Sequence, residues 1–293
     1  MNCICCDSNR IIPQPISSGE YYKCLFCGLT FSLNSTDNNF RTRVASYYQN
    51  VDPHERVASS KQSFFKSSLE YLASEIKSKQ KSILDFGCGY GYFLELALRN
   101  GWHTFGVEIV DEAVQGARKR VGENNIFHGS FKDALYPDEF FDAVTAWDVL
   151  FIVDNPFLEL KECHRILKQG GKIGIRVRNV TFQKLVYRLY LPLQRIASRL
   201  GVRNPYVFHP YCFTRKSLYF LLHRTGFRHI RILNSPLTKG DPYSHTALDW
   251  LTSFIKALVD LTTKAVFWIT RGHWTWGPSL LVWAEKPKLE KIK

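Results

Sequence analysis

Short apolar runs alternate with segments whose apolar residues recur at helical spacing along the middle of the chain. The runs predict strands and the periodic segments predict helices. Predicted strands lie at 82–86, 104–107, 126–127, 141–147 and 172–177, and predicted helices lie at 93–100, 113–121 and 157–167. Because strands that alternate with helices form right-handed βαβ crossovers, the pattern predicts an α/β fold with a doubly wound, mostly parallel sheet.

The flanks of this core are less regular. Helical spacing predicts a helix over 62–77, and the polar stretch before it, 36–60, has the composition of a connector. Residues 181–200 have a helical pattern interrupted at Pro192, and Thr214 is a suitable N-cap for a helix over 215–223. Strands predicted at 230–233 and 280–283 close the sheet, and a long amphipathic helix over 247–269 separates them.

A glycine-rich loop, Asp85-Phe86-Gly87-Cys88-Gly89-Tyr90-Gly91, joins the first predicted strand to its helix. Glycines let the backbone turn sharply and approach a ligand, and a helix N-terminus favours negative charge. Glu108 ends the next strand, where a carboxylate can accept hydrogen bonds from a ribose diol. The spacing D-x-G-x-G-x-G differs from the dinucleotide fingerprint, and its leading acid favours a ligand that carries an ammonium group.

These features resemble the class I S-adenosylmethionine-dependent methyltransferases, over residues 82–226. ILDFGCGYGYF is similar to the family's first motif, GVE to its second, FDAVTAWDVL to its fourth-strand motif and HRILKQGGKIGI to its fifth-strand motif. The resemblance implies a Rossmann-like sheet of seven strands and S-adenosylmethionine as the cofactor. By similarity, the cofactor-binding residues are Asp85, Gly87, Gly89, Glu108, Ser130, Phe131 and Asp148.

The resemblance also assigns a role to each of these residues. Asp85, Gly87 and Gly89 hold the methionine part, and Glu108 binds the ribose. Ser130 and Phe131 fall at the adenine position, and Asp148 lies beside the sulfonium. Two positions depart from the family: an acid is common where Ser130 stands, and Glu-His is frequent where Phe151-Ile152 stands.

Two CxxC pairs lie near the N-terminus, Cys3 with Cys6 and Cys24 with Cys27. This spacing predicts a zinc ribbon in which four thiolates hold one structural Zn²⁺, because a four-thiolate zinc has no open position for catalysis. Cys5 could replace Cys6, and four thiols without metal are the alternative. The module resembles one that precedes methyltransferases in a bacterial group associated with carbohydrate, surface-polysaccharide and secondary-metabolite pathways. We expect the glycine loop to belong to a core separate from this module.

Net charge is +13, and its distribution is uneven. Sixteen of the 39 Lys and Arg residues lie in 163–240, a segment without Asp or Glu, which we call the basic segment. Such a segment attracts phosphate groups, nucleic acid or anionic lipid, unless it only provides a solubility surface. Because it includes the region after the fifth strand, where the family that the chain resembles builds its acceptor pocket, we expect Arg195, Arg199 and Arg203 to contact an anionic acceptor.

Two residues are candidates for catalysis, His209 and Asp148. His209 belongs to a segment, H-x-x-x-F-[ST], similar to one that borders the family's acceptor pocket, and an imidazole can remove a proton from a hydroxyl. The alternative is a packing or capping histidine, and methyl transfer can also proceed by positioning alone. The late amphipathic helix is typical of a helix that covers a domain. Several tryptophans near it indicate the alternative, peripheral contact with a membrane.

The sequence therefore predicts four parts: a zinc-ribbon-like module at 1–35, a linker and leading helix at 36–80, a cofactor-binding core at 81–180, and a substrate-side insertion with closing strands and amphipathic helix at 181–293. No apolar run is long enough to span a membrane, and the first residues lack a secretory signal, so we expect a cytoplasmic protein, with peripheral contact at the inner face of the membrane as an option.

The predicted function is S-adenosylmethionine-dependent methyl transfer to a small-molecule or glycan acceptor, anionic or phosphate-linked. An RNA methyltransferase is the first alternative, since a zinc ribbon and a basic surface both suit nucleic acid. Against RNA, Asp148-Val149 stands where base-amine methyltransferases carry an Asn-Pro-Pro-Tyr-like motif. The second alternative is a non-catalytic module that binds zinc and cofactor.

Overall fold

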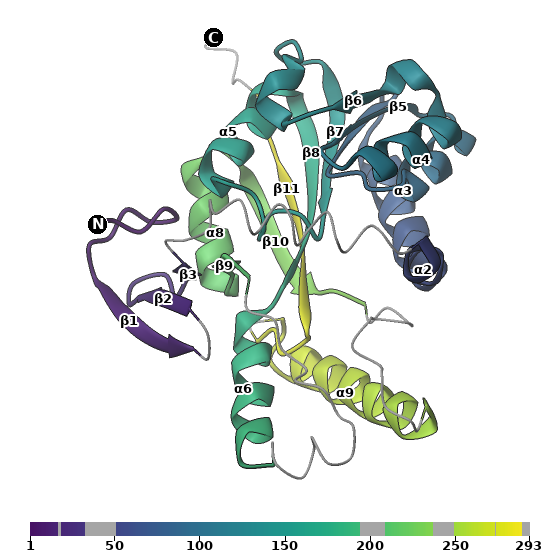
Figure 1. The fold of residues 1–293 in the computed structure, drawn as a ribbon. Coiled ribbons are helices and arrows are strands. Elements are labelled where there is room, and N and C mark those ends of the chain that lie inside the picture. Colours follow the sequence, from purple (N-terminus) through teal and green to yellow (C-terminus); the bar gives the residue numbers. More distant parts are fainter. Residues whose placement is uncertain (17–18, 33–50, 194–208, 237–248, 273, 289–293) are drawn as a thin grey trace.

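The computed structural model describes residues 1–16, 19–32, 51–193, 209–236, 249–272 and 274–288. At their centre is a seven-stranded sheet in the order β10-β11-β8-β7-β4-β5-β6 (Figure 1). The strands are β4 (Ser82–Phe86), β5 (His103–Glu108), β6 (Ile126–His128), β7 (Phe141–Trp147), β8 (Leu167–Arg178), β10 (Arg228–Asn234) and β11 (Ser279–Glu285). Neighbours from β8 to β6 pair in parallel, whereas β11 is antiparallel to both of its neighbours. The predicted mostly parallel seven-stranded sheet is confirmed.

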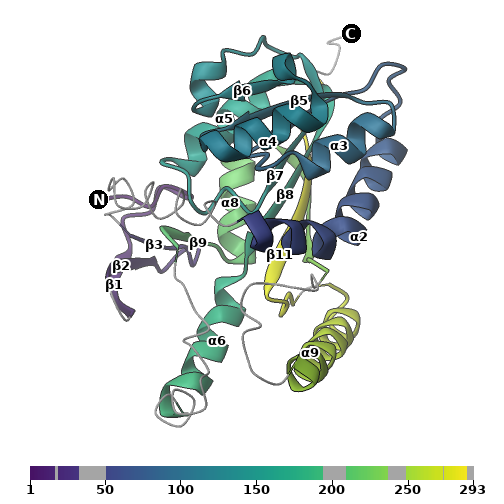
Figure 2. The ribbon, with the colours of Figure 1, turned by 45° about the vertical axis from the view of Figure 1, so that its right-hand side comes forward.

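Helices cover both faces of this sheet (Figures 1 and 2). One face carries α2 (Val51–Glu75), α3 (Tyr92–Arg99) and α4 (Asp111–Val121), and the other carries α5 (Pro156–Ile166) and α8 (Arg215–Arg224). Side chains alternate between the faces along each strand. In β4, Ile83 joins the cluster that contains Phe64, whereas the adjacent Leu84 joins the cluster that contains Leu160.

The leading helix is longer than predicted. Helix α2 begins at Val51, so it includes part of the stretch predicted to be a connector. That stretch contains Pro53, and proline is tolerated in the first turn of a helix, where its missing N–H costs no intrahelical bond. A hydrophobic period does not reveal such a polar turn.

The elements after the fifth strand agree with the prediction where the structure describes them. Helix α6 (Val180–Tyr190) ends in a short 3-10 turn, Leu191–Leu193, and the rest of the predicted helix lies outside the described residues. Thr214 caps α8 as predicted, since its hydroxyl accepts the backbone N–H of Ser217 at 3.0 Å. Helix α9 (Asp249–Ile269) is the predicted amphipathic helix.

A second sheet joins the N-terminal module to the rest of the chain. Its order is β1-β2-β3-β9, where β1 (Ile11–Ile16), β2 (Gly19–Cys24) and β3 (Thr30–Ser32) come from the module and β9 (Tyr211–Cys212) comes from the far side of the sequence. Figure 2 shows β9 beside β3. The Thr214 hydroxyl also donates to the carbonyl oxygen of Cys27 at 3.0 Å.

The expectation of separate cores is wrong. One contiguous buried cluster contains Cys24 and Leu29 of the module together with Phe213, Leu218 and Phe86, the last of these in the strand that leads into the glycine loop. A module with so few strands has little interior of its own, so its apolar residues are buried against the α8 side of the large sheet.

Candidate active site

The glycine loop follows β4, and its backbone conformation admits glycine alone at two points. Gly87 has φ +71°, and a Cβ atom there would lie 2.7 Å from Cγ2 of Val149. Gly91 has φ +78°, and a Cβ atom there would lie 3.0 Å from the backbone Cα of Ala117 on α4. The glycines therefore let the loop pack closely between two neighbouring elements before α3 begins.

Glu108 ends β5 and is buried against this loop. Its carboxylate accepts the backbone N–H of Gly89 at 2.9 Å, of Ile109 at 2.8 Å and of Val110 at 3.1 Å. Burial raises the pKa of Glu108, although these three donors oppose the shift. The structure thus brings together the two features that the sequence predicted to act together, the loop and the acid of the next strand.

Asp85, near the end of β4, is a buried carboxylic acid. Its carboxylate accepts the hydroxyl of Thr145 on the neighbouring strand β7 at 2.6 Å. Burial raises the pKa of Asp85 to about 7, and the charge of Glu108 adds to the rise. Lys61, a cation that acts on Asp85 electrostatically, pairs with Asp148 instead. A buried acid of this kind gains most from a ligand that brings a positive charge.

Asp148 directly follows β7 and has the opposite environment. Its carboxylate pairs with Lys61 of α2 at 2.8 Å and with the guanidinium of Arg176 on β8. Burial alone would raise the pKa of Asp148, but the charges of Arg176 and Lys61 hold it well below its usual range. Arg176 is fixed in turn, because its Nε donates to the hydroxyl of Ser235 at 2.9 Å. Asp148 is therefore an ionised, doubly paired carboxylate.

Sequence reasoning did not assign Lys61 or Arg176 to the site. Arg176 left a signal, since it is a charged residue within the apolar run that forms β8. Lys61 left none, because one lysine in a polar helical stretch has no distinguishing pattern. Its contact with Asp148 joins residues 87 positions apart, and only the packing of α2 across the sheet creates it.

His209 lies just before β9 and is partly buried, with its Nε2 atom shielded from solvent. Its ring packs against Phe151 with the ring centroids 4.3 Å apart, and its Nε2 has no hydrogen-bond partner within the described part of the chain. Burial, with the charge of Arg178, lowers the pKa of His209 to about 3, so the imidazole is neutral. Phe151, which stands in place of the family's common Glu-His, thus forms one wall around this histidine.

Ser130 and Phe131, predicted near adenine, have different surroundings. The Ser130 hydroxyl bonds to the carboxylate of Asp133, which brings an acid to the position where Ser130 departs from the family. The Phe131 ring is buried and stacks on Phe86 with centroids 4.6 Å apart, so its side chain belongs to the core.

The four predicted zinc ligands lie together. The Sγ atoms of Cys3, Cys6, Cys24 and Cys27 are all within 4.8 Å of one another, and the Cys3–Cys27 and Cys6–Cys24 distances are 3.6 and 3.5 Å. Zinc–sulfur bonds of about 2.3 Å in a tetrahedron place sulfurs about 3.8 Å apart. The cluster therefore has the size that one zinc ion requires, and Cys5 lies outside the set of four.

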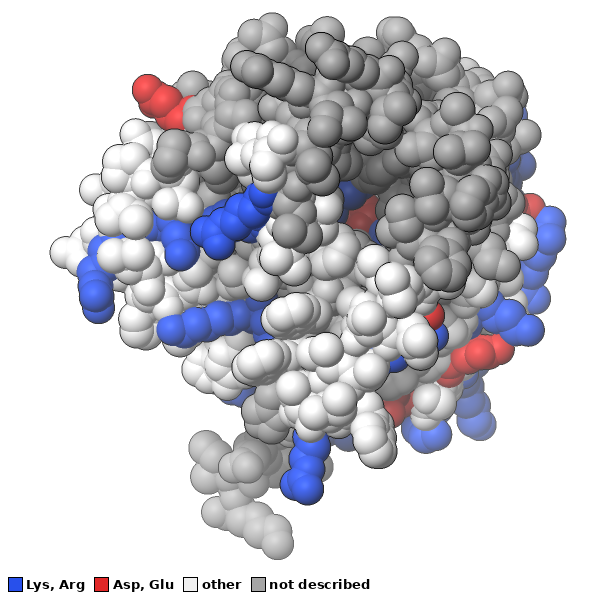
Figure 3. All heavy atoms as spheres, turned by 90° about the horizontal axis from the view of Figure 1, so that it is seen from below, with Lys and Arg blue, Asp and Glu red and all other residues white. Residues whose placement is uncertain are grey.

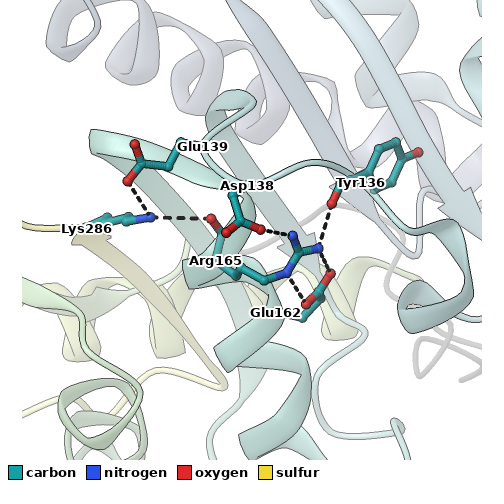
Figure 4. Close-up of polar contacts among 6 residues, drawn as sticks. All are labelled: Tyr136, Asp138, Glu139, Glu162, Arg165 and Lys286. Carbon is teal, nitrogen blue, oxygen red and sulfur yellow. Dashed lines mark hydrogen bonds and ion pairs between the residues drawn. The ribbon is translucent and has the colours of Figure 1, made fainter.

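Part of the basic segment is neutralised far from this site. Lys168 pairs with Asp142 at 2.9 Å, and Lys172 pairs with Glu285 at 2.8 Å. Arg165 lies between Asp138 and Glu162 (Figure 4). These pairs lie around the start of β8, opposite its carboxyl end, so they cannot contribute to an acceptor site beside Asp148. The three arginines predicted to contact the acceptor, Arg195, Arg199 and Arg203, lie outside the described residues.

Comparison with known proteins identifies the class. A family model described as a methyltransferase domain matches residues 57–232, and the chain belongs to this family. Together with the fold and the predicted motifs, the match makes the chain a class I S-adenosylmethionine-dependent methyltransferase.

Curated relatives cover only part of the chain. It is similar to the ubiquinone biosynthesis O-methyltransferase of Coxiella burnetii, with 26% identity over 125 residues that make up 41% of this chain and 53% of the relative. The corresponding enzyme of Xanthomonas oryzae pv. oryzae is 29% identical over 118 residues, which are 39% of this chain and 49% of that protein. The chain thus spans about half the length of the curated relatives that it matches.

Solved structures share the fold. An S-adenosylmethionine-dependent methyltransferase from Thermotoga maritima aligns with a TM-score of 0.51 and 18% identity, over 82% of this chain and 97% of the other. The plantazolicin methyltransferase BpumL, in complex with SAH, aligns with a TM-score of 0.50 and 18% identity, over 87% and 93% of the two chains.

Proposed function

We propose that this methyltransferase transfers a methyl group from S-adenosylmethionine to a hydroxyl oxygen of a small-molecule or glycan acceptor that carries a negative charge. The observation that carries the proposal is the group of cations at the carboxyl ends of β7 and β8, where Lys61 and Arg176 surround Asp148 and Arg178 acts on the partly buried His209. The relatives named as O-methyltransferases support oxygen as the acceptor atom.

The residues around the glycine loop fit the cofactor. Asp85 is a buried acid suited to the ammonium group of the methionine part, and the Glu108 carboxylate is suited to the ribose hydroxyls. The glycines at 87 and 91 let the loop pack closely against Val149 and Ala117. S-adenosylmethionine supplies an electrophilic methyl group on its sulfonium, so the protein needs to position the acceptor oxygen and receive its proton.

His209 is the proposed proton acceptor. Its low pKa keeps the ring neutral, and its Nε2, which has no hydrogen-bond partner among the described residues, can accept a hydrogen bond from the acceptor hydroxyl. The negative charge of Asp148 favours the protonated ring once the proton has moved. Asp148 itself is not the base in this proposal, because its carboxylate is already paired with two cations. It positions Lys61 and Arg176 instead.

Methyl-labelled S-adenosylmethionine tests this function. The protein is incubated with a metabolite extract and, separately, with total RNA, and the products are fractionated by anion exchange. We expect the label in small molecules that the exchanger retains, as ether linkages stable to alkali. His209→Gln should slow labelling by about a hundredfold or more while binding S-adenosylmethionine normally. The proposal would be contradicted if the label appeared in RNA, or if wild type and His209→Gln labelled the acceptor at the same rate.

We also propose that Cys3, Cys6, Cys24 and Cys27 hold one structural zinc ion. The sulfur distances and the closed four-thiolate donor set support this assignment. Metal analysis of protein purified without chelator should give one zinc per chain, and Cys6→Ala should lose it. Cys5→Ala is the matched control and should keep the metal. If Cys5→Ala lost the zinc and Cys6→Ala kept it, the fourth ligand would be Cys5 and not Cys6.

A further inference from the structure

The outward face of α9 is apolar. Leu258, Leu261, Ala265, Trp268 and Ile269 follow one another at steps of three or four residues, except for the adjacent last pair, so they share one side of the helix. Leu261 is 67% exposed, Trp268 is 83% exposed and Ile269 is 72% exposed. The buried Thr263 lies on the opposite side, where its carbonyl oxygen accepts a hydrogen bond from Asn234 of β10. The usual arrangement of a surface helix is thus reversed.

Two more exposed tryptophans follow the helix. Trp274 and Trp276, just after the helix, are exposed and stack with their ring centroids 6.0 Å apart. We call the exposed residues of α9 on its outward side, Leu258, Leu261, Trp268 and Ile269, the tryptophan face. Tryptophan is enriched where proteins meet the interface of a bilayer, because its ring is apolar while its N–H remains in a wet layer.

Charge around the tryptophan face is positive. Arg271 and Lys264 are exposed beside it. Asp260 pairs with Lys264 at 2.7 Å, so these three residues together carry one net positive charge, that of Arg271. Viewed from below, Lys and Arg side chains lie at the edges of an uncharged surface, with some Asp and Glu side chains among them (Figure 3). Exposed apolar side chains with a net positive charge beside them complement an anionic lipid surface.

The placement of α9 relates this surface to the active site. Both α6 and α9 extend from the lower end of the sheet in Figures 1 and 2, and α6 follows directly from the carboxyl end of β8. Arg176, close to that end of β8, belongs to the proposed acceptor site. Helix α9 therefore lies on the side of the molecule from which an acceptor would approach.

We propose that the tryptophan face docks this protein on a membrane that contains anionic lipid, with α9 parallel to the bilayer surface. No helix within the described residues has the length and hydropathy to cross a bilayer. An interfacial helix needs neither, because it inserts only its apolar side chains among the headgroups. The acceptor site then faces the lipid surface. The docking stands on exposure and charge, independently of the proposed methyl transfer.

Vesicle flotation with the full chain tests the proposal. The variant is Leu261→Ser/Trp268→Ser, and the matched control is Leu158→Ser, which removes an exposed leucine from α5. Wild type and control should float with phosphatidylcholine vesicles that contain phosphatidylglycerol, and the double variant should partition at least about tenfold more weakly. Binding should also weaken when salt is raised or phosphatidylglycerol is omitted.

Further measurements distinguish membrane docking from loss of folding and from dimerisation. S-adenosylmethionine affinity and the thermal midpoint should be the same in wild type and double variant, which shows that lost flotation is not lost folding. Equal flotation of the two proteins would overturn the proposal. So would a wild-type dimer that the double variant dissociates while vesicle binding is absent, because the tryptophan face would then be an interface between two copies.

Discussion

Asp85 and Asp148 stand at the carboxyl ends of the neighbouring strands β4 and β7, yet their surroundings differ in charge. Asp85 is buried beside a hydroxyl and a second acid, and its pKa rises to about 7. Asp148 is partly exposed and lies between a lysine and an arginine, and its pKa falls well below its usual range. Asp85 has no ion-pair partner among the described residues, whereas Asp148 has two, Lys61 and Arg176.

This difference indicates a division of labour between the two halves of the site. The half around β4 and β5 contains acids and backbone N–H groups, which suits a ligand with an ammonium group and hydroxyls. The half around β7 and β8 contains Lys61, Arg176 and Arg178, which suits an anionic acceptor. Environments that push two pKa values apart are a common way to assign different roles to similar side chains.

The largest expected effect comes from removing the charge of Asp148. Asp148→Asn leaves the buried Arg176 without its anionic partner, so the free energy of unfolding should fall by about 3–5 kcal/mol in urea denaturation. Asp138→Asn is the matched control, because Asp138 pairs with Arg165 on the surface (Figure 4) and should cost about 1 kcal/mol or less. If the two variants lost the same free energy of unfolding, the pairing of Asp148 with Lys61 and Arg176 would stabilise the fold no more than a surface ion pair does.

The next effect concerns proton release at Asp85. With a pKa of about 7, most molecules carry a proton on Asp85 at pH 6 and few do at pH 8. Because only the carboxylate pairs with an ammonium group, affinity for S-adenosylmethionine should rise about tenfold over this range, with proton release in calorimetry.

The sign for stability is the reverse of the sign for binding. The folded-state pKa lies above the unfolded value, so Asp85 lowers the free energy of unfolding progressively as the pH rises from about 4 to about 7. Asp85→Asn should abolish both dependences. An unchanged affinity profile in that variant would place the titration on another group.

The smallest effect tests the hydroxyl that supports Asp85. Thr145→Val removes the 2.6 Å hydrogen bond to the carboxylate while keeping the side-chain shape. The pH midpoint of S-adenosylmethionine binding should rise by about one unit, and affinity at pH 7 should fall about fivefold. A shift toward lower pH would show that Thr145 stabilises the protonated acid instead.

Local patterns account for the parts of the structure that the sequence predicted. The strands and helices around the glycine loop depend on period and turn residues within a few positions, and Glu108 meets Gly89 because neighbouring parallel strands end at one edge. The Lys61–Asp148 pair and the β3–β9 pairing join distant segments, and no local pattern encodes them. Phe131 was predicted near adenine, but its ring is part of the core. The sequence around a phenylalanine does not distinguish a ring that contacts a ligand from a ring that packs in the core.

The position of β11 has a consequence for how the chain is made. This strand lies between β8 and β10 in space but follows both in sequence, separated from β8 by all of α6, α8, β10 and α9. During synthesis, β10 emerges with no neighbour to pair with, and the sheet remains split until Ser279–Glu285 has left the ribosome. A stalled translation product that stops within α9 would expose two unpaired strand edges, and quality-control proteases and chaperones recognise such products.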